Sequence, residues 1–162
     1  MGNLLERKSV LVVKNYLRAI DSTIKLIELD TTARTAKDAA QSLKVELGCI
    51  VKSLVFKSLK KNLYYLCLVS GDKFISEKKL SLIIDDEIEK ASADQTKNYT
   101  GYSIGGVPPV GHSNSPTQIF IDSNLKRFEK IYAAAGHPYV VFGMTFEQIC
   151  KLTNGKIIDY VE

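Results

Sequence analysis

The spacing of apolar residues changes along the chain between helical and strand periods. Near the start, apolar residues recur every three or four positions, which predicts an amphipathic helix over residues 9–20. A short strand over 24–29 is expected next. Thr35 is followed three residues later by Asp38, a spacing typical of a capping box, so a helix is predicted over 36–43.

The middle of the chain favours a β-hairpin. Residues 50–57 and 63–69 are rich in β-branched and aromatic side chains, and the polar stretch 60–62 between them predicts a turn. The elements expected after this hairpin are helices at 76–84 and from Ser92 to about Thr100, a strand at 117–121, a helix at 125–135, a strand at 139–142, a helix from Thr145 to about Asn154 and a strand at 156–161.

This order of elements predicts a mixed α/β fold in one domain over residues 1–162, with strands in both orientations. The length is that of a single domain, and neither a repeat nor a linker interrupts it. With 45% hydrophobic and 25% charged residues, the composition is typical of a soluble globular protein. No apolar run is long enough to span a bilayer, and residues 1–10 lack the apolar core of a signal peptide, so we expect a cytoplasmic protein without a membrane partner.

Cysteine spacing and net charge narrow the chemistry only slightly. The chain has three cysteines that are far apart in the sequence, Cys49, Cys67 and Cys150, and no Cys/His cluster has metal-ligand spacing. We therefore expect reduced, buried thiols, and we expect neither a metal nor another cofactor. The net charge of +4 suits a nucleic-acid partner without demonstrating one.

Lys52 is the first candidate for chemistry. Strand alternation places it on the same face as Ile50, Leu54 and Phe56, within a segment that is apolar on both faces. Its ammonium either reaches the edge of the sheet, which composition alone favours, or points into a cleft toward a carbonyl or phosphate oxygen.

The second candidate is the loop over residues 101–111, which contains Gly105, Gly106, Val107, Pro108, Pro109 and Gly111. It matches neither the P-loop nor the dinucleotide-binding pattern. The two glycines permit a close backbone approach to a ligand, and the two prolines fix their own φ angles. The N–H groups of residues 105–107 are therefore available to a bound oxygen, although an ordinary surface turn has the same composition.

His137 is the third candidate. It lies between Gly136 and Pro138, after the helix expected at 125–135, where it either serves a site or meets the negative end of the helix dipole. His112 is a weaker candidate. No nucleophile elbow or metalloprotease pattern occurs.

Taken together and in order, the segments 50–56, 105–111 and 136–137 resemble the YbaK and prolyl-tRNA synthetase editing-domain family, from about Thr35 to the end of the chain. The resemblance implies a compact α/β fold around a mixed, barrel-like sheet with surrounding helices. It also implies metal-independent hydrolysis of amino acids wrongly attached to tRNA, usually tRNA(Pro).

The resemblance carries over residue by residue. Lys52 matches the characteristic lysine of the family, and the segment from Gly105 to Pro109 matches a loop that contacts the aminoacyl ester and terminal adenosine. Gly111 ends that motif, and His137 matches a histidine near the amino-acid pocket. Pro108 stands where the family often has serine, which would stiffen the loop. We therefore assign Lys52, Gly105 and Gly106 to catalysis, and Val107, Pro108, Pro109, Gly111 and His137 to substrate binding.

The expected partner is the acceptor end of mischarged tRNA, not DNA, with prolyl-tRNA synthetase and an elongation factor left open as further partners. An aminoacyl ester is already activated, so the site needs only to hold it, stabilise the oxyanion and place a water. The alternative is a tRNA-binding or synthetase-associated module without catalysis. A general small-molecule hydrolase would need a nucleophile or metal set that the sequence does not offer.

Overall fold

The computed structural model describes residues 3–30 and 33–162, which form a mixed α/β domain as expected. Its helices are α1 (Lys8–Ile20), α2 (Ala36–Leu43), α3 (Glu77–Ile84), α4 (Ala93–Thr100) and α5 (Phe146–Thr153), with short 3₁₀ helices η1 (Leu4–Glu6), η2 (Leu47–Cys49) and η3 (Ser123–Arg127). Its strands are β1 (Leu26–Glu28), β2 (Val51–Ser58), β3 (Tyr64–Ser70), β4 (Ile88–Lys90), β5 (Gln118–Asp122), β6 (Ile131–His137), β7 (Val140–Met144) and β8 (Lys156–Ile158).

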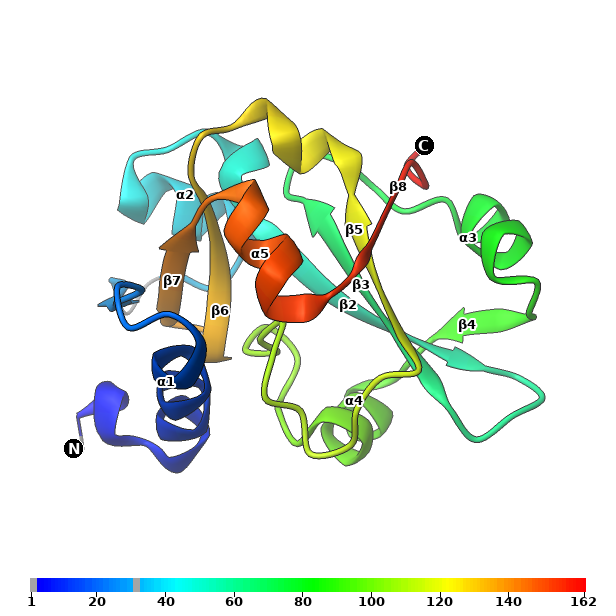
Figure 1. The fold of residues 1–162 in the computed structure, drawn as a ribbon, viewed down its shortest axis with the longest axis horizontal. Helices are drawn as coiled ribbons and strands as arrows, with labels where there is room; N and C mark the ends of the chain where they lie inside the picture. Colours follow the sequence, from blue (N-terminus) through cyan, green and yellow to red (C-terminus); the bar gives the residue numbers. More distant parts are fainter. Residues whose placement is uncertain (1–2, 31–32) are drawn as a thin grey trace.

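These strands form two sheets rather than one closed barrel (Figure 1). The larger sheet has the order β4-β2-β3-β5-β8, in which β3, β5 and β8 are parallel and the β2–β3 hairpin is antiparallel. The smaller sheet, β1-β7-β6, is antiparallel. A single parallel bridge between Ile50 and Tyr132 connects them, so the start of β2 marks the seam between the two sheets.

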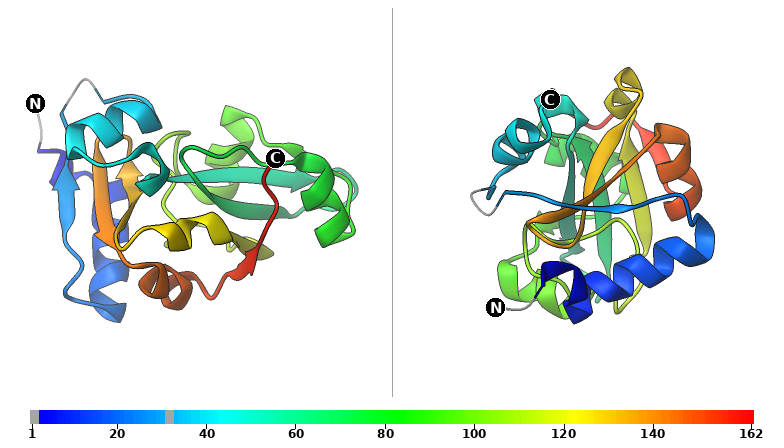
Figure 2. Two further views of the ribbon diagram at one scale, coloured as in Figure 1. Left: turned by 90° about the horizontal axis from the view of Figure 1, so that it is seen from above. Right: turned by 90° about the vertical axis from the view of Figure 1, so that its left-hand side faces the viewer.

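The core lies between the sheets and under α1, and Figure 2 shows α1 running along one end of the molecule. Alternation along β2 assigns its two faces to different clusters. Val51 and Val55 pack into the main cluster, whereas Phe56 packs on the opposite face against Leu80 of α3. Each large side chain fully buried in this way contributes roughly 1.5–3 kcal/mol.

Local sequence signals set most element boundaries. The predicted capping boxes at Thr35, Ser92 and Thr145 are all present, each with its N-cap side chain and its third helical residue bonded to the other's backbone N–H. Such caps contribute about 1 kcal/mol each and fix where α2, α4 and α5 begin.

The helix predicted over 125–135 is wrong. That region contains η3 and then β6, whose residues alternate between buried (Ile131, Ala133, Ala135) and half-buried. Three alanines in a row favour a helix locally, but pairing with β7 and burial of the alternate residues override that weak preference. The short strand β4, which pairs with Phe56–Ser58, was not predicted.

Candidate functional site

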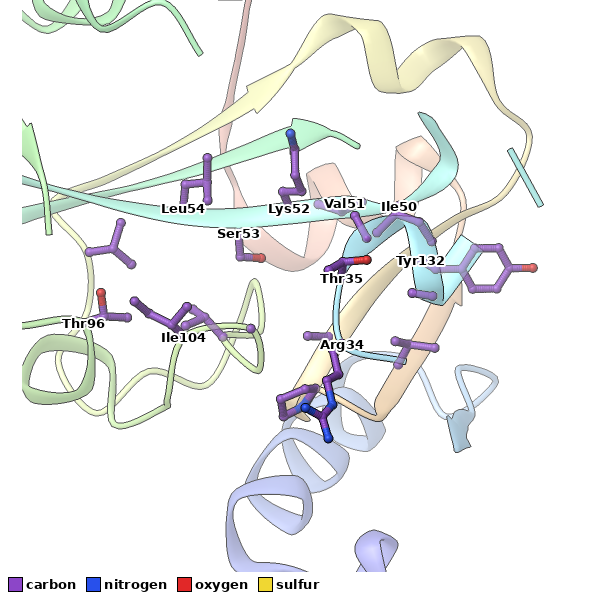
Figure 3. Close-up of a pocket in the computed structure, with 18 of the residues that line it drawn as sticks. Arg34, Thr35, Ile50, Val51, Lys52, Ser53, Leu54, Thr96, Ile104 and Tyr132 are labelled. Carbon is purple, nitrogen blue, oxygen red and sulfur yellow. The ribbon is translucent and has the colours of Figure 1, made fainter. Parts of the chain in front are cut away.

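A cavity of about 240 Å³ lies at the seam between the two sheets (Figure 3). Its walls come from the start of β2, the N-terminus of α2, the segment from β4 to α4, the loop after α4 and the β6–β7 hairpin. The lining is mostly apolar, including Val55, Ala91, Val107, Ala134 and Val141. Elements far apart in the sequence thus converge on one small chamber.

The cavity exists because β2 is incompletely paired. One edge of β2 pairs with β3 from Val51 to Lys57. On its other edge, β4 pairs only with residues 56–58, and β6 bridges only to Ile50. Between these points, the edge of residues 51–54 has no strand partner among the described residues, and it forms one wall of the chamber.

Lys52 belongs to this wall, but its ammonium is bound on the side of β2 opposite Ser53. Its Nζ donates a hydrogen bond of 2.6 Å to the Lys73 carbonyl and lies 4.7 Å from the centroid of the Phe74 ring. Burial lowers the pKa of Lys52, while the nearby charges of Asp72 and Asp122 act in the opposite direction. Figure 3 shows the side chains of Lys52 and Ser53 on opposite sides of β2.

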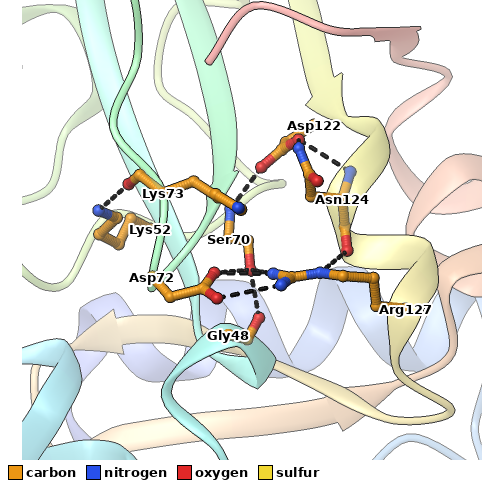
Figure 4. A network of polar contacts seen from close by, with 8 residues as sticks. All are labelled: Gly48, Lys52, Ser70, Asp72, Lys73, Asp122, Asn124 and Arg127. Atoms are coloured by element: carbon orange, nitrogen blue, oxygen red, sulfur yellow. Dashed lines mark hydrogen bonds and ion pairs between the residues drawn. The ribbon is translucent and has the colours of Figure 1, made fainter. Parts of the chain in front are cut away.

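A polar network fixes the turn that carries the Lys73 carbonyl (Figure 4). Arg127 donates to both carboxylate oxygens of Asp72, at 3.0 and 2.7 Å, and lowers the pKa of Asp72 to about 2. The buried Asp122 accepts from the Ser70 N–H at 3.0 Å. The side chains of the Arg127–Asp72 ion pair are about a third exposed, so the pair contributes at most about 1 kcal/mol to stability. It nevertheless fixes the geometry of the turn next to Lys52.

The predicted glycine–proline loop only partly reaches the cavity. Gly105 and Val107 line it, whereas Pro108, Pro109 and Gly111 lie outside its lining. The Gly106 N–H donates to the Ser103 carbonyl at 3.0 Å, so it is not free for a substrate oxygen, contrary to expectation. Two of the three expected donors remain, those of Gly105 and Val107.

Gly106 instead allows two segments to meet. A Cβ at this position would lie 3.0 Å from the His137 Cα, closer than an ordinary contact, so glycine lets the loop pack against the β6–β7 hairpin without displacing it. The structure therefore brings the predicted loop and the predicted histidine segment together.

His137 ends β6 and does not follow a helix, so the alternative role at a helix C-terminus is wrong. Its Nδ1 accepts from the Tyr139 N–H at 3.1 Å, and its ring meets the Tyr139 ring edge-on. Burial, with a smaller effect from the Arg7 charge, lowers the pKa of His137. The cavity is lined by the adjacent Pro138 rather than by His137.

His112 has a structural position. Its Nε2 lies 2.6 Å from the Pro108 carbonyl, which can only accept, so Nε2 carries the proton. Its Nδ1 lies 2.9 Å from the Tyr64 hydroxyl. Burial lowers the pKa of His112, consistent with a neutral ring that holds the loop.

Sequence reasoning missed Ser53. Its Oγ is shielded from solvent and has no hydrogen-bond partner among the described residues. The signal was present, because alternation places Ser53 between Val51 and Val55, where an apolar residue is expected. Arg34, Thr35, Lys90 and Thr96 also line the cavity and were not predicted.

Among the described residues, no group of three or more His, Cys, Asp or Glu side chains is placed to hold a metal ion. No described helix has the length and apolarity needed to cross a membrane.

Comparison with known sequences identifies one family over most of the chain. The model of a family described as "Aminoacyl-tRNA editing domain" matches residues 30–152. The uncharacterized protein YwhH of Bacillus subtilis is 28% identical over 130 residues, covering 80% of this chain and 82% of YwhH. A proline–tRNA ligase of Lactobacillus gasseri is 34% identical over 102 residues, which are 62% of this chain but only 18% of the ligase.

Solved structures agree with the sequence matches. A structure described provisionally as a trans-editing enzyme for prolyl tRNA synthetase is 35% identical, with a TM-score of 0.90 and coverage of 96% of this chain and 98% of that one. The hypothetical protein APE2540 is 24% identical with a TM-score of 0.85, which supports the fold alone.

Proposed function

The chain belongs to the aminoacyl-tRNA editing domain family, and on that premise we propose that it hydrolyses the ester bond of mischarged tRNA. The observation that carries this proposal is the cavity between the two sheets. It is small, mostly apolar and bordered by the family-like segments around Lys52, Gly105 and Val107.

The charges around the cavity suit a tRNA end. Arg34, Lys52 and Lys90 contribute to its walls, whereas no acidic side chain of residues 3–30 and 33–162 does. Cations near the cavity attract phosphate, and their small number favours contact with the single-stranded acceptor end over a long duplex footprint. The mild net charge of +4 agrees with such a limited contact.

Catalysis at this site requires positioning rather than a protein nucleophile. The N–H groups of Gly105 and Val107 are the donors proposed for the developing oxyanion, and Lys52 is proposed to orient the acceptor end through a charge-assisted hydrogen bond. For this role, Lys52 is proposed to give up the Lys73 carbonyl, on the side of β2 opposite Ser53, and to bind a substrate oxygen instead. The 2′-hydroxyl of the terminal ribose is proposed to help place the attacking water.

Action in trans on tRNA(Pro) is the finer part of the proposal. It is supported by the solved relative described provisionally as a trans-editing enzyme and by the similarity to one segment of proline–tRNA ligases. His137 is proposed to contact the substrate at the rim of the cavity, because its Nε2 has no hydrogen-bond partner among the described residues. Prolyl-tRNA synthetase and an elongation factor remain proposed partners.

The test is a deacylation panel under single-turnover conditions. The protein is incubated with tRNA(Pro) and tRNA(Ala) carrying alanine, cysteine, serine, threonine or 2-aminobutyrate, and released amino acid is measured. We expect release from at least one mischarged tRNA(Pro), little from prolyl-tRNA(Pro), and no change after exhaustive chelation. Activity lost on chelation and restored by zinc would contradict the metal-free mechanism.

Two observations favour a second candidate, a non-catalytic tRNA-binding module. The Lys52 ammonium is held by the Lys73 carbonyl, and the Gly106 N–H is used within its own loop. That candidate predicts binding of charged tRNA without release of any amino acid in the same panel.

A further inference from the structure

Ser53 is the most unusual polar group in the cavity. Its hydroxyl is buried and lacks a hydrogen-bond partner among the residues that the structure describes. Figure 3 shows it on the side of β2 that faces Thr35, Thr96 and Ile104, opposite Lys52. Its neighbours on the same face, Val51 and Val55, are apolar and buried.

The backbone of Ser53 faces the same chamber. In an antiparallel pair, the N–H and C=O of one residue point to one edge, and those of the next residue point to the other. Ser58 donates toward β3, to Leu63, whereas Val55 accepts from Ala91 on the β4 edge. Ser53 is two residues from Val55, so its N–H and C=O also point away from β3, where no described strand pairs with it.

A buried hydroxyl without a hydrogen-bond partner is less favourable than one that is hydrogen-bonded. Ser53 is the one buried hydroxyl that the described residues leave unpaired, and on its own face of β2 it stands between two valines. A ligand that brings a hydrogen-bonding group to Ser53 would pair this hydroxyl, whereas a purely apolar ligand of the same size would leave the hydroxyl unpaired. Such a site discriminates by hydrogen bonding rather than by size.

We propose that Ser53 is the specificity-determining residue of the cavity, and that it selects small aminoacyl groups with a side-chain hydroxyl or thiol over those with only a methyl or ethyl group. This inference rests on the proposed function in taking an aminoacyl-adenosine end as the ligand. The small, apolar surroundings of Ser53 favour contact with a short side chain, because the charged α-ammonium is better placed in water than beside valines.

The experiment measures binding as well as turnover. Two non-hydrolysable probes, the 3′-amide-linked seryl and alanyl derivatives of 3′-amino-3′-deoxyadenosine, are titrated by calorimetry into the wild-type protein and into Ser53→Ala. We expect the wild type to bind the seryl probe about tenfold more tightly than the alanyl probe, and Ser53→Ala to bind the two within about twofold.

Two controls separate specificity from folding. Ser58→Ala removes another hydroxyl of β2, one that accepts from the Lys61 N–H outside the cavity, and should retain the wild-type ratio. The melting temperature of Ser53→Ala should be no lower than that of the wild type, because no protein hydrogen bond is lost. Ser53→Thr, which keeps the hydroxyl, should retain a preference for the seryl probe.

The outcomes of these experiments either support or overturn the role of Ser53. Equal binding of the two probes by the wild type, or equal weakening of both in a destabilised Ser53→Ala, overturns the assignment. A seryl preference that depends on Ser53, in a protein that releases no amino acid from any mischarged tRNA, would support this specificity role and contradict the proposed hydrolysis.

Discussion

The two faces of β2 differ in whether their polar side chains have hydrogen-bond partners within the described structure. On one face, Lys52 is engaged by the Lys73 carbonyl and the Phe74 ring, beside a turn fixed by Asp72 and Arg127. On the other face, Ser53 has a buried hydroxyl without a partner in the described structure. Adjacent residues on one strand therefore differ in whether the protein itself satisfies them.

This difference indicates where a ligand is needed. A satisfied polar group is stable without a ligand and must exchange a partner to bind one, whereas an unsatisfied group gains a partner on binding. We therefore expect Lys52 to exchange the Lys73 carbonyl when a ligand binds, and Ser53 to gain its first hydrogen-bond partner from that ligand. Substitutions on the two faces should consequently affect different quantities, namely rate on the Lys52 side and choice of amino acid on the Ser53 side.

The largest expected effect is that of Lys52→Ala. If the ammonium orients the acceptor end, its loss removes one charged contact worth on the order of 2–4 kcal/mol, a drop of roughly thirtyfold to a thousandfold in deacylation. Lys52→Arg should restore little, because a planar guanidinium does not replace a compact ammonium in a confined site. Single-turnover assays, with circular dichroism to confirm folding, measure this effect.

Lys57→Ala is the matched control for Lys52. Lys57 lies on the same strand but outside the cavity, where it pairs with Glu89 at 2.9 Å. Its loss should leave the rate within about twofold, as expected for a partly exposed ion pair. If a folded Lys52→Ala protein had the same rate as Lys57→Ala, the Lys52 ammonium would only reach the edge of the sheet and would have no role in the reaction.

A smaller effect is expected for Gly106→Ala. The added Cβ would lie 3.0 Å from the His137 Cα. The φ angle of Gly106 is not in the left-handed region, so the loss of stability would arise from this contact rather than from backbone strain. We expect about 1–3 kcal/mol of destabilisation in urea unfolding and a slower reaction, because the loop and hairpin must separate. Unchanged stability would show that the two segments are not packed this tightly in solution.

The smallest effect is expected for His137→Ala. His137 lies next to the lining residue Pro138 but outside the lining itself, and its Nδ1 accepts one backbone hydrogen bond, worth about 1 kcal/mol net. We expect a loss of roughly two- to fivefold that is similar for all amino acids in the deacylation panel. A loss confined to one amino acid would instead place the imidazole against the variable side chain, the role that the family resemblance implies.

Much of the fold was predictable because its signals are local. Capping boxes, the β2–β3 hairpin and the amphipathic α1 are encoded in neighbouring residues, and all are present. The region of β6 was misassigned because its alanines favour a helix in isolation. They form a strand only because they pair with β7, and a pattern of neighbouring residues does not reveal that pairing.

The site was predictable only in part for a similar reason. The sequence marked Lys52, Gly105, Gly106 and His137, but not the direction of the Lys52 ammonium or the internal use of the Gly106 N–H, which depend on tertiary contacts. Ser53 escaped notice because a serine in a strand is ordinary. Only the missing strand partner at residues 51–54 gives it significance.

The central claim is that mischarged tRNA is hydrolysed in the cavity between the two sheets, and blocking that cavity tests it most directly. Ala134 is half-buried and lines the chamber, so Ala134→Leu fills part of it while leaving Lys52 and Ser53 unchanged. Ala93→Leu, on the exposed first turn of α4 outside the lining, is the control. With both variants folded, we predict that single-turnover deacylation falls at least tenfold in Ala134→Leu and not in Ala93→Leu. An Ala134→Leu protein that deacylates at the wild-type rate would contradict the account.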